Sequence, residues 1–415
     1  MNIIRNIARL IIAPVFIFAG FVKLIDPLGL VYKFNDYFEA FHLDFLNPVA
    51  KVIAIVLIAA ELLIGLNLFL KIRMKETSWA LLIFMVFFTV FTFIIALTNP
   101  VTDCGCFGDA LILTNWQTFF KNIIFLIPTL LVFHQRNQYN QIFSSVFQWA
   151  VTVSFFFLNI LVSFYFLRNL PLIDFRPYKI GTHIPSAMEI PEGMPVDEYE
   201  TVLVYEKDGI SKEFSLSSPE QPWNDSTWKW VETKNVLIRE GYKPPIHDFS
   251  LTSLEGDDIT DQVLLDPGYS FLVVAYDLAK SSPESLNDIK TFSRRVIKNG
   301  YSVYGMTSST DDVIYEITDP YKFSFKFYTS DEITLKTMIR SNPGLILIQN
   351  GIILGKWSGR DLPDPDLFAN NPLSHCISEL ESAKNKGIAQ VIILFFALLG
   401  ILMTTFRLYR FSDNQ

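Results

Sequence analysis

The chain has 415 residues, half of them hydrophobic, and a mean hydropathy of +0.31. This composition is typical of a membrane protein and excludes an ordinary soluble enzyme, while a formal net charge of -8 argues against nucleic acid as a partner, since phosphate binding needs a basic surface. Three cysteines are too few for a disulfide scaffold.

Six apolar runs have the length of about 17 to 25 residues that crosses a lipid bilayer. They lie at 6–25, 50–70, 77–98, 116–134, 147–167 and 388–406. The first is interpreted as a retained span, because Asp26-Pro27 and an aromatic segment follow it instead of a small-residue cleavage site.

Basic residues in the short connections predict the orientation of these spans. Eight of them fall on one side, which is therefore predicted to be cytoplasmic: Arg5, Arg9, Lys71, Arg73, Lys75, Arg136, Arg407 and Arg410. The opposite side receives the loop around Cys104 and the polar segment after Arg168. We therefore expect a multi-pass membrane protein whose Cys104 loop and large polar domain face the same, non-cytoplasmic compartment, where a disulfide persists.

The loop between the third and fourth spans reads Asp103-Cys104-Gly105-Cys106-Phe107-Gly108-Asp109. A disulfide between Cys104 and Cys106 would close a smaller ring than a Cys-x-x-Cys disulfide, so it is expected to be strained and easily reduced, as a pair that shuttles electrons requires. Gly105 and Gly108 permit the tight backbone of such a ring. The pattern predicts a catalytic thiol pair, and a loop staple or two idle thiols is the alternative.

Four further side chains are candidates. Glu61 lies in the middle of the second span, where a carboxylate is costly unless it is paired or protonated, which indicates a proton or quinone contact or else a hydrogen-bonded packing residue. Lys23 and Lys121 lie nearer the outer face, where they snorkel or lean towards Glu61, and Lys23 is a second candidate for the proton or quinone contact. Cys376 is a candidate resolving thiol, or a small apolar helix residue. The five histidines have no ligand spacing, so no metal is expected.

The polar part of the chain divides in two. Residues 200–216 alternate and contain an Asp-Gly turn, which predicts a hairpin. The following region reads as alternating strands and helices. Its predicted elements are strands at 249–254, 271–276 and 301–306, helices at 283–299, 311–318 and 331–340, and a hairpin at 345–355 that turns on Asn350-Gly351.

The first 140 residues resemble the MauE (methylamine utilisation) family, relatives of the DoxX membrane proteins. The resemblance depends on Cys104-Gly105-Cys106-Phe107-Gly108 between the third and fourth spans, with Phe18-Ala19-Gly20-Phe21-Val22-Lys23 and Glu61 in the first two. It implies a four-helix membrane bundle with periplasmic disulfide or quinone-linked redox chemistry. It names no substrate.

Residues 243–366 resemble the thioredoxin-like fold of the TlpA and peroxiredoxin type, from Pro245-Ile246-His247-Asp248-Phe249 to the Asn342-Pro343-Gly344 turn. The resemblance implies a cis-proline at Pro343, beside the active site. The family places Cys-x-x-Cys after the strand that ends at Tyr276, but this chain has Asp277-Leu278-Ala279-Lys280 and no sulfur there. The domain is therefore expected to bind or dock a partner and not to exchange disulfides itself.

The predicted fold class is an α-helical membrane bundle with an α/β thioredoxin-like periplasmic domain and a small β subdomain. The expected parts are the bundle (1–140), a fifth span (141–168), a β-rich region (169–242), the thioredoxin-like domain (243–370), a helical connector (371–387) and a last span with a short cytoplasmic tail (388–415). Two functions stay open. One is a membrane thiol–disulfide oxidoreductase that uses Cys104 and Cys106, a membrane quinone and a periplasmic protein partner; the other is a non-catalytic envelope assembly or anchoring protein.

Overall fold

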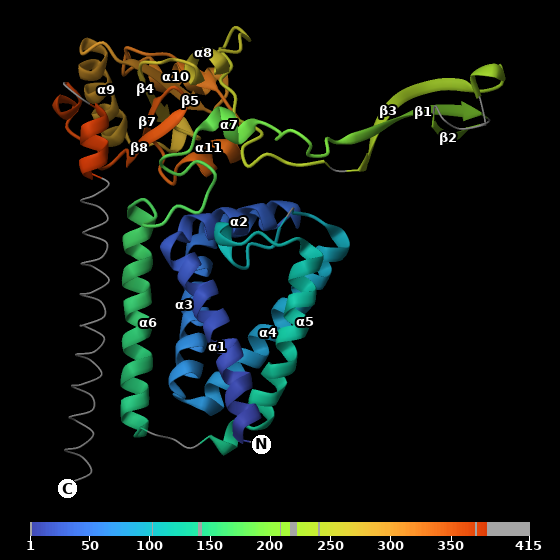
Figure 1. Cartoon of the computed structure of the whole chain (residues 1–415), viewed down its shortest axis with the longest axis vertical. Coiled ribbons are helices and arrows are strands. Elements are labelled where there is room, and N and C mark those ends of the chain that lie inside the picture. Colours follow the sequence, from blue (N-terminus) through green and yellow to red (C-terminus); the bar gives the residue numbers. More distant parts are fainter. Residues whose placement is uncertain are drawn as a thin grey trace.

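The computed structural model describes residues 2–101, 103–139, 143–207, 209–215, 222–239, 241–369 and 372–379. Five long helices stand side by side, and a domain with a five-stranded sheet lies over one end of them (Figure 1). The chain therefore divides into a helical bundle and an α/β domain, as the sequence predicts.

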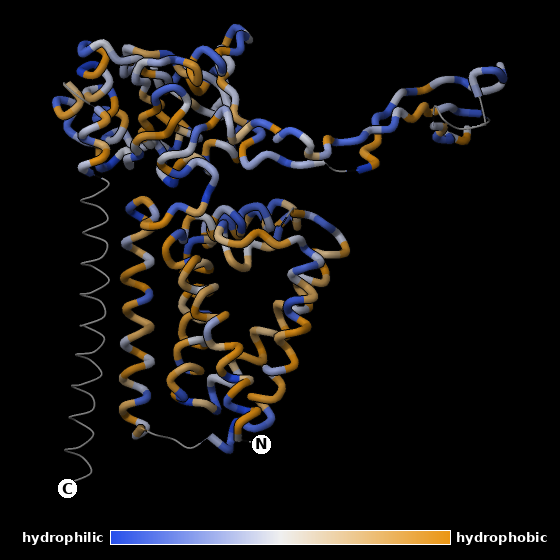
Figure 2. The backbone as a smooth tube through the Cα atoms, in the orientation of Figure 1, coloured by the Kyte–Doolittle hydropathy of each residue, from blue (hydrophilic) through white to orange (hydrophobic). Residues whose placement is uncertain are grey.

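Five helices of the bundle are long and apolar enough to cross a membrane. They are α1 (Asn2–Ile25), α3 (Ala50–Leu70), α4 (Met74–Thr98), α5 (Asn115–His134) and α6 (Ser145–Arg168). Hydrophobic colouring predominates along them (Figure 2). Five predicted spans are confirmed as helices of spanning length, and the sixth, at 388–406, lies outside the described residues.

Glycines let α1 and α3 approach closely. A Cβ atom on Gly65 of α3 would lie 2.8 Å from the backbone nitrogen of Ile17 in α1, and one on Gly20 would lie 2.6 Å from the Leu62 side chain. Small residues at such crossings are how helices pack within a bilayer, where no hydrophobic force drives them together. The contact brings Lys23 of α1 opposite Glu61 of α3.

The two ends of the bundle differ. At one end Arg5 donates to the carbonyl of Gln138 (2.8 Å), so the predicted cytoplasmic connections meet there. The other end carries residues 99–114, hereafter the thiol loop, and we call it the thiol end. Here α2 (Pro27–Ala40) lies across the bundle (Figure 1). The predicted spans leave residues 26–49 as a connection, and no helix is expected there, although Asp26 at the N-cap of α2 and Pro27 at its first turn are a start signal.

The α/β domain has the strand order β6-β5-β4-β7-β8. Strands β4 (Tyr269–Val274), β5 (Ser302–Thr307) and β6 (Phe327–Thr329) are parallel, and β7 (Gly344–Gln349) and β8 (Ile352–Ser358) run antiparallel to their neighbours. The helices are α7 (Ile184–Met188), α8 (Thr260–Leu264), α9 (Pro283–Lys298), α10 (Asp311–Thr318) and α11 (Glu332–Met338). This arrangement confirms the predicted thioredoxin-like fold.

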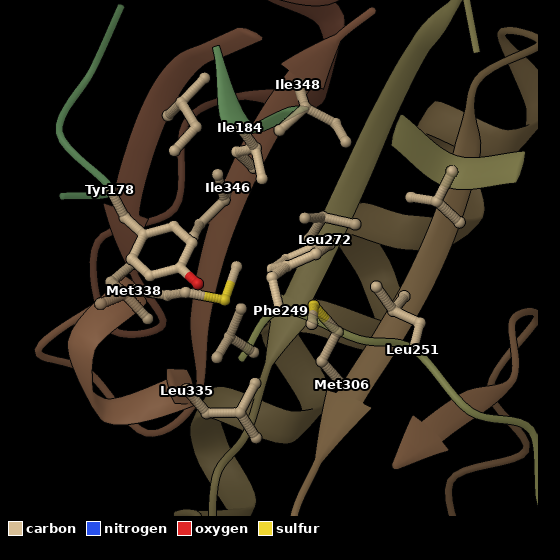
Figure 3. Close-up of a cluster of buried hydrophobic side chains, with 14 of the residues drawn as sticks. Tyr178, Ile184, Phe249, Leu251, Leu272, Met306, Leu335, Met338, Ile346 and Ile348 are labelled. Carbon is tan, nitrogen blue, oxygen red and sulfur yellow. The ribbon is translucent and has the colours of Figure 1, made fainter. Parts of the chain in front are cut away.

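Side chains of β4 and β7 alternate between the two faces of the sheet. On one face Leu272 and Ile346 pack against Tyr178 and Ile184 (Figure 3). The predicted β-rich region begins at residue 169, but these two residues precede its first strand, which begins at Glu198. On the other face Phe271 packs with residues of α9. Because Tyr178 and Ile184 belong to this core, the β-rich sheet is an insertion within the thioredoxin-like domain.

One predicted strand does not form. Residues 249–254 make only isolated bridges from Thr252, to Asp258 and to Thr329. The neighbouring β6 has three residues and offers too short an edge for a ladder. Phe249 and Leu251 are buried nonetheless, so the apolar pattern of this segment reflects burial in the core without strand pairing.

The inserted sheet has the order β2-β1-β3 and extends away from the domain as an arm (Figure 1). Strand β1 (Glu198–Lys207) pairs with β2 (Ile210–Ser215), which confirms the predicted hairpin, and with β3 (Lys229–Arg239). Every residue of β3 is exposed.

Candidate functional site

The thiol loop is fastened beneath α2. Tyr37 of α2 donates its hydroxyl hydrogen to the carbonyl of Cys104 (2.9 Å), and Lys33 of the same helix forms an ion pair with Asp103 (2.7 Å). Gly105 and Gly108 adopt positive φ angles of 67° and 51°, which residues with a Cβ rarely adopt. These contacts turn both sulfur atoms into the bundle.

The two thiols lie side by side. Their Sγ atoms are 2.9 Å apart and unbonded, and Cys104 is 8% exposed. A disulfide bond is about 2.05 Å long, so the pair could close with a small movement of the sulfur atoms. The arrangement suits reversible formation of a disulfide within the loop.

The environments of the two thiols are unequal. A hydrogen bond from Cys104, assisted by the charges of Lys121 and Lys23 and opposed by burial, lowers the pKa of Cys106 to about 6. The same hydrogen bond and burial raise the pKa of Cys104 well above its ordinary value. Cys106 is therefore the thiolate of the pair at neutral pH, and the thiolate is the reactive form of cysteine.

A buried ion pair lies next to the thiols. Lys23 Nζ is 2.7 Å from each carboxylate oxygen of Glu61, and the two side chains are 4% and 8% exposed. The sequence singled out both residues separately, and the structure joins them. Lys121, assigned to the membrane surface as one alternative, instead lies 4.4 Å over the Phe107 ring and lines the same pocket as Glu61.

A pocket that is partly open to the outside lies within the bundle beside the two thiols. Cys104, Cys106, Lys23 and Glu61 line it together, so the structure brings four of the predicted site residues to one place. The rest of the lining is mostly apolar. Its aromatic side chains include Phe34, Tyr37, Phe84, Phe88, Phe91 and Phe125. Sequence reasoning gave no signal for Tyr37, whose role depends on the fold of α2 over the loop.

The edge of the thioredoxin-like domain that faces the thiol end contains Tyr276 and Asp277, directly after β4. The Asn342–Pro343 peptide bond beside them is cis. The Asn342 side chain donates to the carbonyl of Asp277 (2.6 Å) and accepts from its N–H (3.3 Å). We call these four residues the sulfur-free edge.

Cys376 lies apart from the thiol loop. It is buried in the core on the α9 face of the sheet, with Phe271 and Phe368, and burial raises its pKa to about 11. No described contact joins it to Cys104 or Cys106, so a role as resolving thiol stays a prediction that requires its exposure. Within the described ranges, no three or more His, Cys, Asp and Glu side chains gather as a metal would need.

Comparison with known families identifies the membrane part. Residues 1–134 match the family model of the methylamine utilisation protein MauE. This match covers α1 to α5 and the thiol loop, and it confirms the MauE resemblance for that part of a multi-pass membrane protein. The likeness to DoxX proteins stays a prediction. Residues 199–240, the arm, match a domain of unknown function, DUF8463.

No curated protein matches the chain. Solved structures that match include a secreted Mycobacterium tuberculosis disulfide oxidoreductase homologous to E. coli DsbE (12% identity, 29% of this chain, 92% of that chain, TM-score 0.24) and the peroxidoxin BcpB from M. tuberculosis (13%, 32%, 94%, 0.25). A third is a putative protein disulfide isomerase from Bacteroides thetaiotaomicron (12%, 33%, 86%, 0.24). At such identities a likeness concerns the fold and not the activity.

Proposed function

We propose that the protein is a membrane thiol–disulfide oxidoreductase in which Cys104 and Cys106 alternate between dithiol and disulfide and pass electrons to a membrane quinone. The observation that supports this most strongly is the shared pocket: both sulfurs line an apolar cavity inside the bundle, next to the Lys23–Glu61 pair. The distribution of Lys and Arg supports a thiol end that faces the periplasm of a bacterial inner membrane.

The lining suits a quinone ring. Phe84, Phe88 and Phe125 provide flat apolar surface and keep water from the reacting atoms, while Lys23 and Lys121 offer charge to a ring oxygen. A bound quinone takes up two electrons and two protons when it becomes a quinol, which is the amount that a dithiol releases when it becomes a disulfide.

The side chains have distinct roles in this reaction. Cys106 is the nucleophile, because its thiolate is stable at neutral pH. Cys104 keeps its proton until its sulfur bonds to that of Cys106; two electrons then pass to the quinone, which takes up the proton of Cys104 and a second proton from its surroundings. The Lys23–Glu61 pair, buried beside the pocket, can release and recover a proton there.

The test uses the full-length protein in lipid nanodiscs, reduced with dithiothreitol and freed of it, with a short-chain ubiquinone analogue. We expect loss of quinone absorbance in step with loss of two titratable thiols, and a fall of at least about 100-fold in rate for Cys106→Ser, because the nucleophile is absent. Cys376→Ala is the matched control and keeps its rate. Equal rates for the wild type and the Cys104→Ser/Cys106→Ser double variant would rule out the proposal.

The second function, assembly or anchoring of envelope proteins without catalysis, is supported by the absence of sulfur after β4 and by the exposed arm. It predicts that Cys104→Ser and Cys106→Ser leave the cellular role intact. The quinone assay and growth of these variants together separate the two functions.

A further inference from the structure

The sulfur-free edge lies directly against the thiol end. The hydroxyl oxygen of Tyr276, after β4, is 3.1 Å from that of Tyr32 in α2. Lys336 of α11 lies 5.1 Å above the Tyr32 ring, at cation–π distance. The domain therefore meets the bundle with the edge on which a thioredoxin-like protein carries its reactive thiols.

Arg340, three residues before Pro343, fastens this contact. Its Nε is 2.9 Å from a carboxylate oxygen of Asp26, and its Nη2 is 2.9 Å from one of Asp109. Its Nη1 donates to the carbonyl of Lys336 (2.7 Å), which fixes the side chain to its own domain. The Arg340 side chain is 7% exposed and that of Asp26 is 18% exposed, so this pair is better shielded from water than an ordinary surface pair, while the Asp109 side chain is 42% exposed.

One of the two carboxylates belongs to the helix above the thiol loop and the other belongs to the loop itself. Asp26 is the N-cap of α2, the helix that covers the loop, and Asp109 is the last residue of the Cys-Gly-Cys segment. One guanidinium group thus joins the helix, the loop and the domain. Arg340 links α2 to the loop through Asp26 and Asp109, and removal of the domain would break this link.

The loop presents different atoms to its two sides. Both sulfurs line the pocket inside the bundle. The cavity on the outer side is lined by Asp103, Gly105 and Gly108 from the loop and by Phe175 and Arg176 from the segment that leads into the domain, and neither sulfur is among its lining residues. A thiol carried by a folded protein therefore lacks a direct approach to the pair while the domain is docked.

We propose that the thioredoxin-like domain is a tethered cap that occupies the docking surface of a thiol-bearing thioredoxin-fold protein, formed by Asp26, Tyr32 and Asp109. The partner has a basic residue where this domain has Arg340, and it reaches Cys104 and Cys106 only after the cap has left. This role of the surface depends on the disulfide exchange proposed above.

The exchange with such a partner balances. A thiolate of the partner attacks one sulfur of the Cys104–Cys106 disulfide, the disulfide opens, and a mixed disulfide forms. The second thiol of the partner loses its proton and attacks the partner's first sulfur in the mixed disulfide, which releases the sulfur of this chain. The partner leaves oxidised, and the pair in this chain is a dithiol that holds the two electrons.

The first experiment measures access to the thiols in nanodiscs, with the reduced full-length protein, Cys376→Ala as background and a 5-kDa polyethylene glycol maleimide as the probe. We expect slow modification in this background and about tenfold faster modification in Arg340→Glu, which places a third carboxylate beside Asp26 and Asp109. Arg295→Glu is the matched control, because Arg295 pairs with Asp366 on the exposed surface of the same domain. It should keep the slow rate.

A second variant guards against unfolding of the domain. Asp26→Asn/Asp109→Asn leaves the domain sequence intact, and Asn at position 26 still caps α2. It should also accelerate modification. Unchanged rates of maleimide modification in both Arg340→Glu and Asp26→Asn/Asp109→Asn would overturn the proposal that the domain is a cap.

Electron transfer is then measured separately, with dithiothreitol or reduced thioredoxin as donor and the ubiquinone analogue as acceptor. Dithiothreitol should support quinone reduction in every variant. Reduced thioredoxin should support quinone reduction at least about tenfold faster in Arg340→Glu than in the wild type. Equal thioredoxin rates would overturn the cap and leave the proposed function standing. No quinone reduction with either donor would overturn the proposed function, and with it the role of the docking surface in exchange.

Discussion

At the scale of single residues, the thiol loop converts two chemically identical side chains into unlike ones. A hydrogen bond joins the two thiols, and Lys121 and Lys23 add positive charge, so that the pKa of Cys106 is lowered while that of Cys104 is raised. Burial alone would keep both thiols neutral. The asymmetry therefore comes first from the hydrogen bond within the Cys-Gly-Cys segment, and the charges of Lys23 in α1 and Lys121 in α5 add to it.

This asymmetry predicts a pH profile. Because the pKa of Cys106 is about 6 instead of 9, its thiolate fraction should rise through pH 6 and be nearly complete by pH 7, and its modification by iodoacetamide should level off there. Cys104→Ala removes the hydrogen bond that lowers the pKa most and should move the midpoint to higher pH. The measurement is the rate of carboxamidomethylation between pH 5 and 10 in the Cys376→Ala background. A midpoint at an ordinary thiol pKa in the parent protein would contradict the assignment of Cys106 as nucleophile.

At the scale of elements, Lys23 and Glu61 connect α1 to α3 at the depth of the pocket. Loss of one partner leaves a buried charge without compensation, so Glu61→Leu and Lys23→Met should each cost about 3–5 kcal/mol of stability. The double variant Lys23→Met/Glu61→Leu should recover most of it, because no lone charge remains. Thermal unfolding in detergent is the measurement.

Quinone reduction distinguishes a chemical role of this pair from a structural one. If the pair moves protons, the double variant should be stable but should reduce quinone at a rate at least about tenfold below that of the wild type. If the double variant recovers both stability and rate, the pair only joins two helices. Leu62→Ile, beside Glu61 in α3, is a control for altered packing without loss of charge.

Local pattern predicted most of the elements but not the contacts between distant ones. The spans are long apolar runs, and the hairpin of β7 and β8 turns on Asn350-Gly351, so both are signals within a short window. The strand expected at 249–254 was wrong because burial and strand pairing produce the same apolar pattern. The Arg340–Asp26 pair joins residues 314 positions apart and exists only because one folded edge meets another.

The candidate site was predictable to the same extent. Cys104 and Cys106 are separated by one residue, and a charged residue inside a span such as Glu61 indicates a buried partner. That Lys23 is this partner follows from the crossing of α1 and α3. Tyr37 could not be predicted as a site residue, because its hydroxyl reaches Cys104 only through the packing of α2 over the loop.

At the scale of the whole molecule, the bundle, the thioredoxin-like domain and the arm differ in how closely they contact one another. The bundle and the domain share buried ion pairs, whereas the arm extends into solvent with Trp230 and the run Val236, Leu237 and Ile238 exposed. Exposed apolar residues along a strand are a surface that proteins ordinarily cover. The catalytic and the anchoring hypotheses therefore refer to different modules of one chain and can be tested on separate parts.

The base of the arm makes this separation practical. The backbone N–H of Gly241 donates to the Asp197 carboxylate (2.7 Å), and that of Tyr242 donates to the carbonyl of Pro195 (2.7 Å), so the two ends of the insertion are held together within the domain. Replacement of residues 198–239 by a short Gly-Ser linker should leave the core around Tyr178 and Ile184 intact, because no arm residue belongs to it. Quinone reduction and the slow maleimide reaction should both be unchanged.

The cellular outcome of the same deletion decides between the two functions. If electron transfer is the role of the protein, cells with the arm deleted should grow like the wild type and cells with Cys104→Ser/Cys106→Ser should not. The reverse result, loss of growth on deletion of the arm with the cysteine variant healthy, would assign the function to anchoring through the arm. Loss of quinone reduction on deletion of the arm would show that the arm supports the docked domain, contrary to its separation from that core.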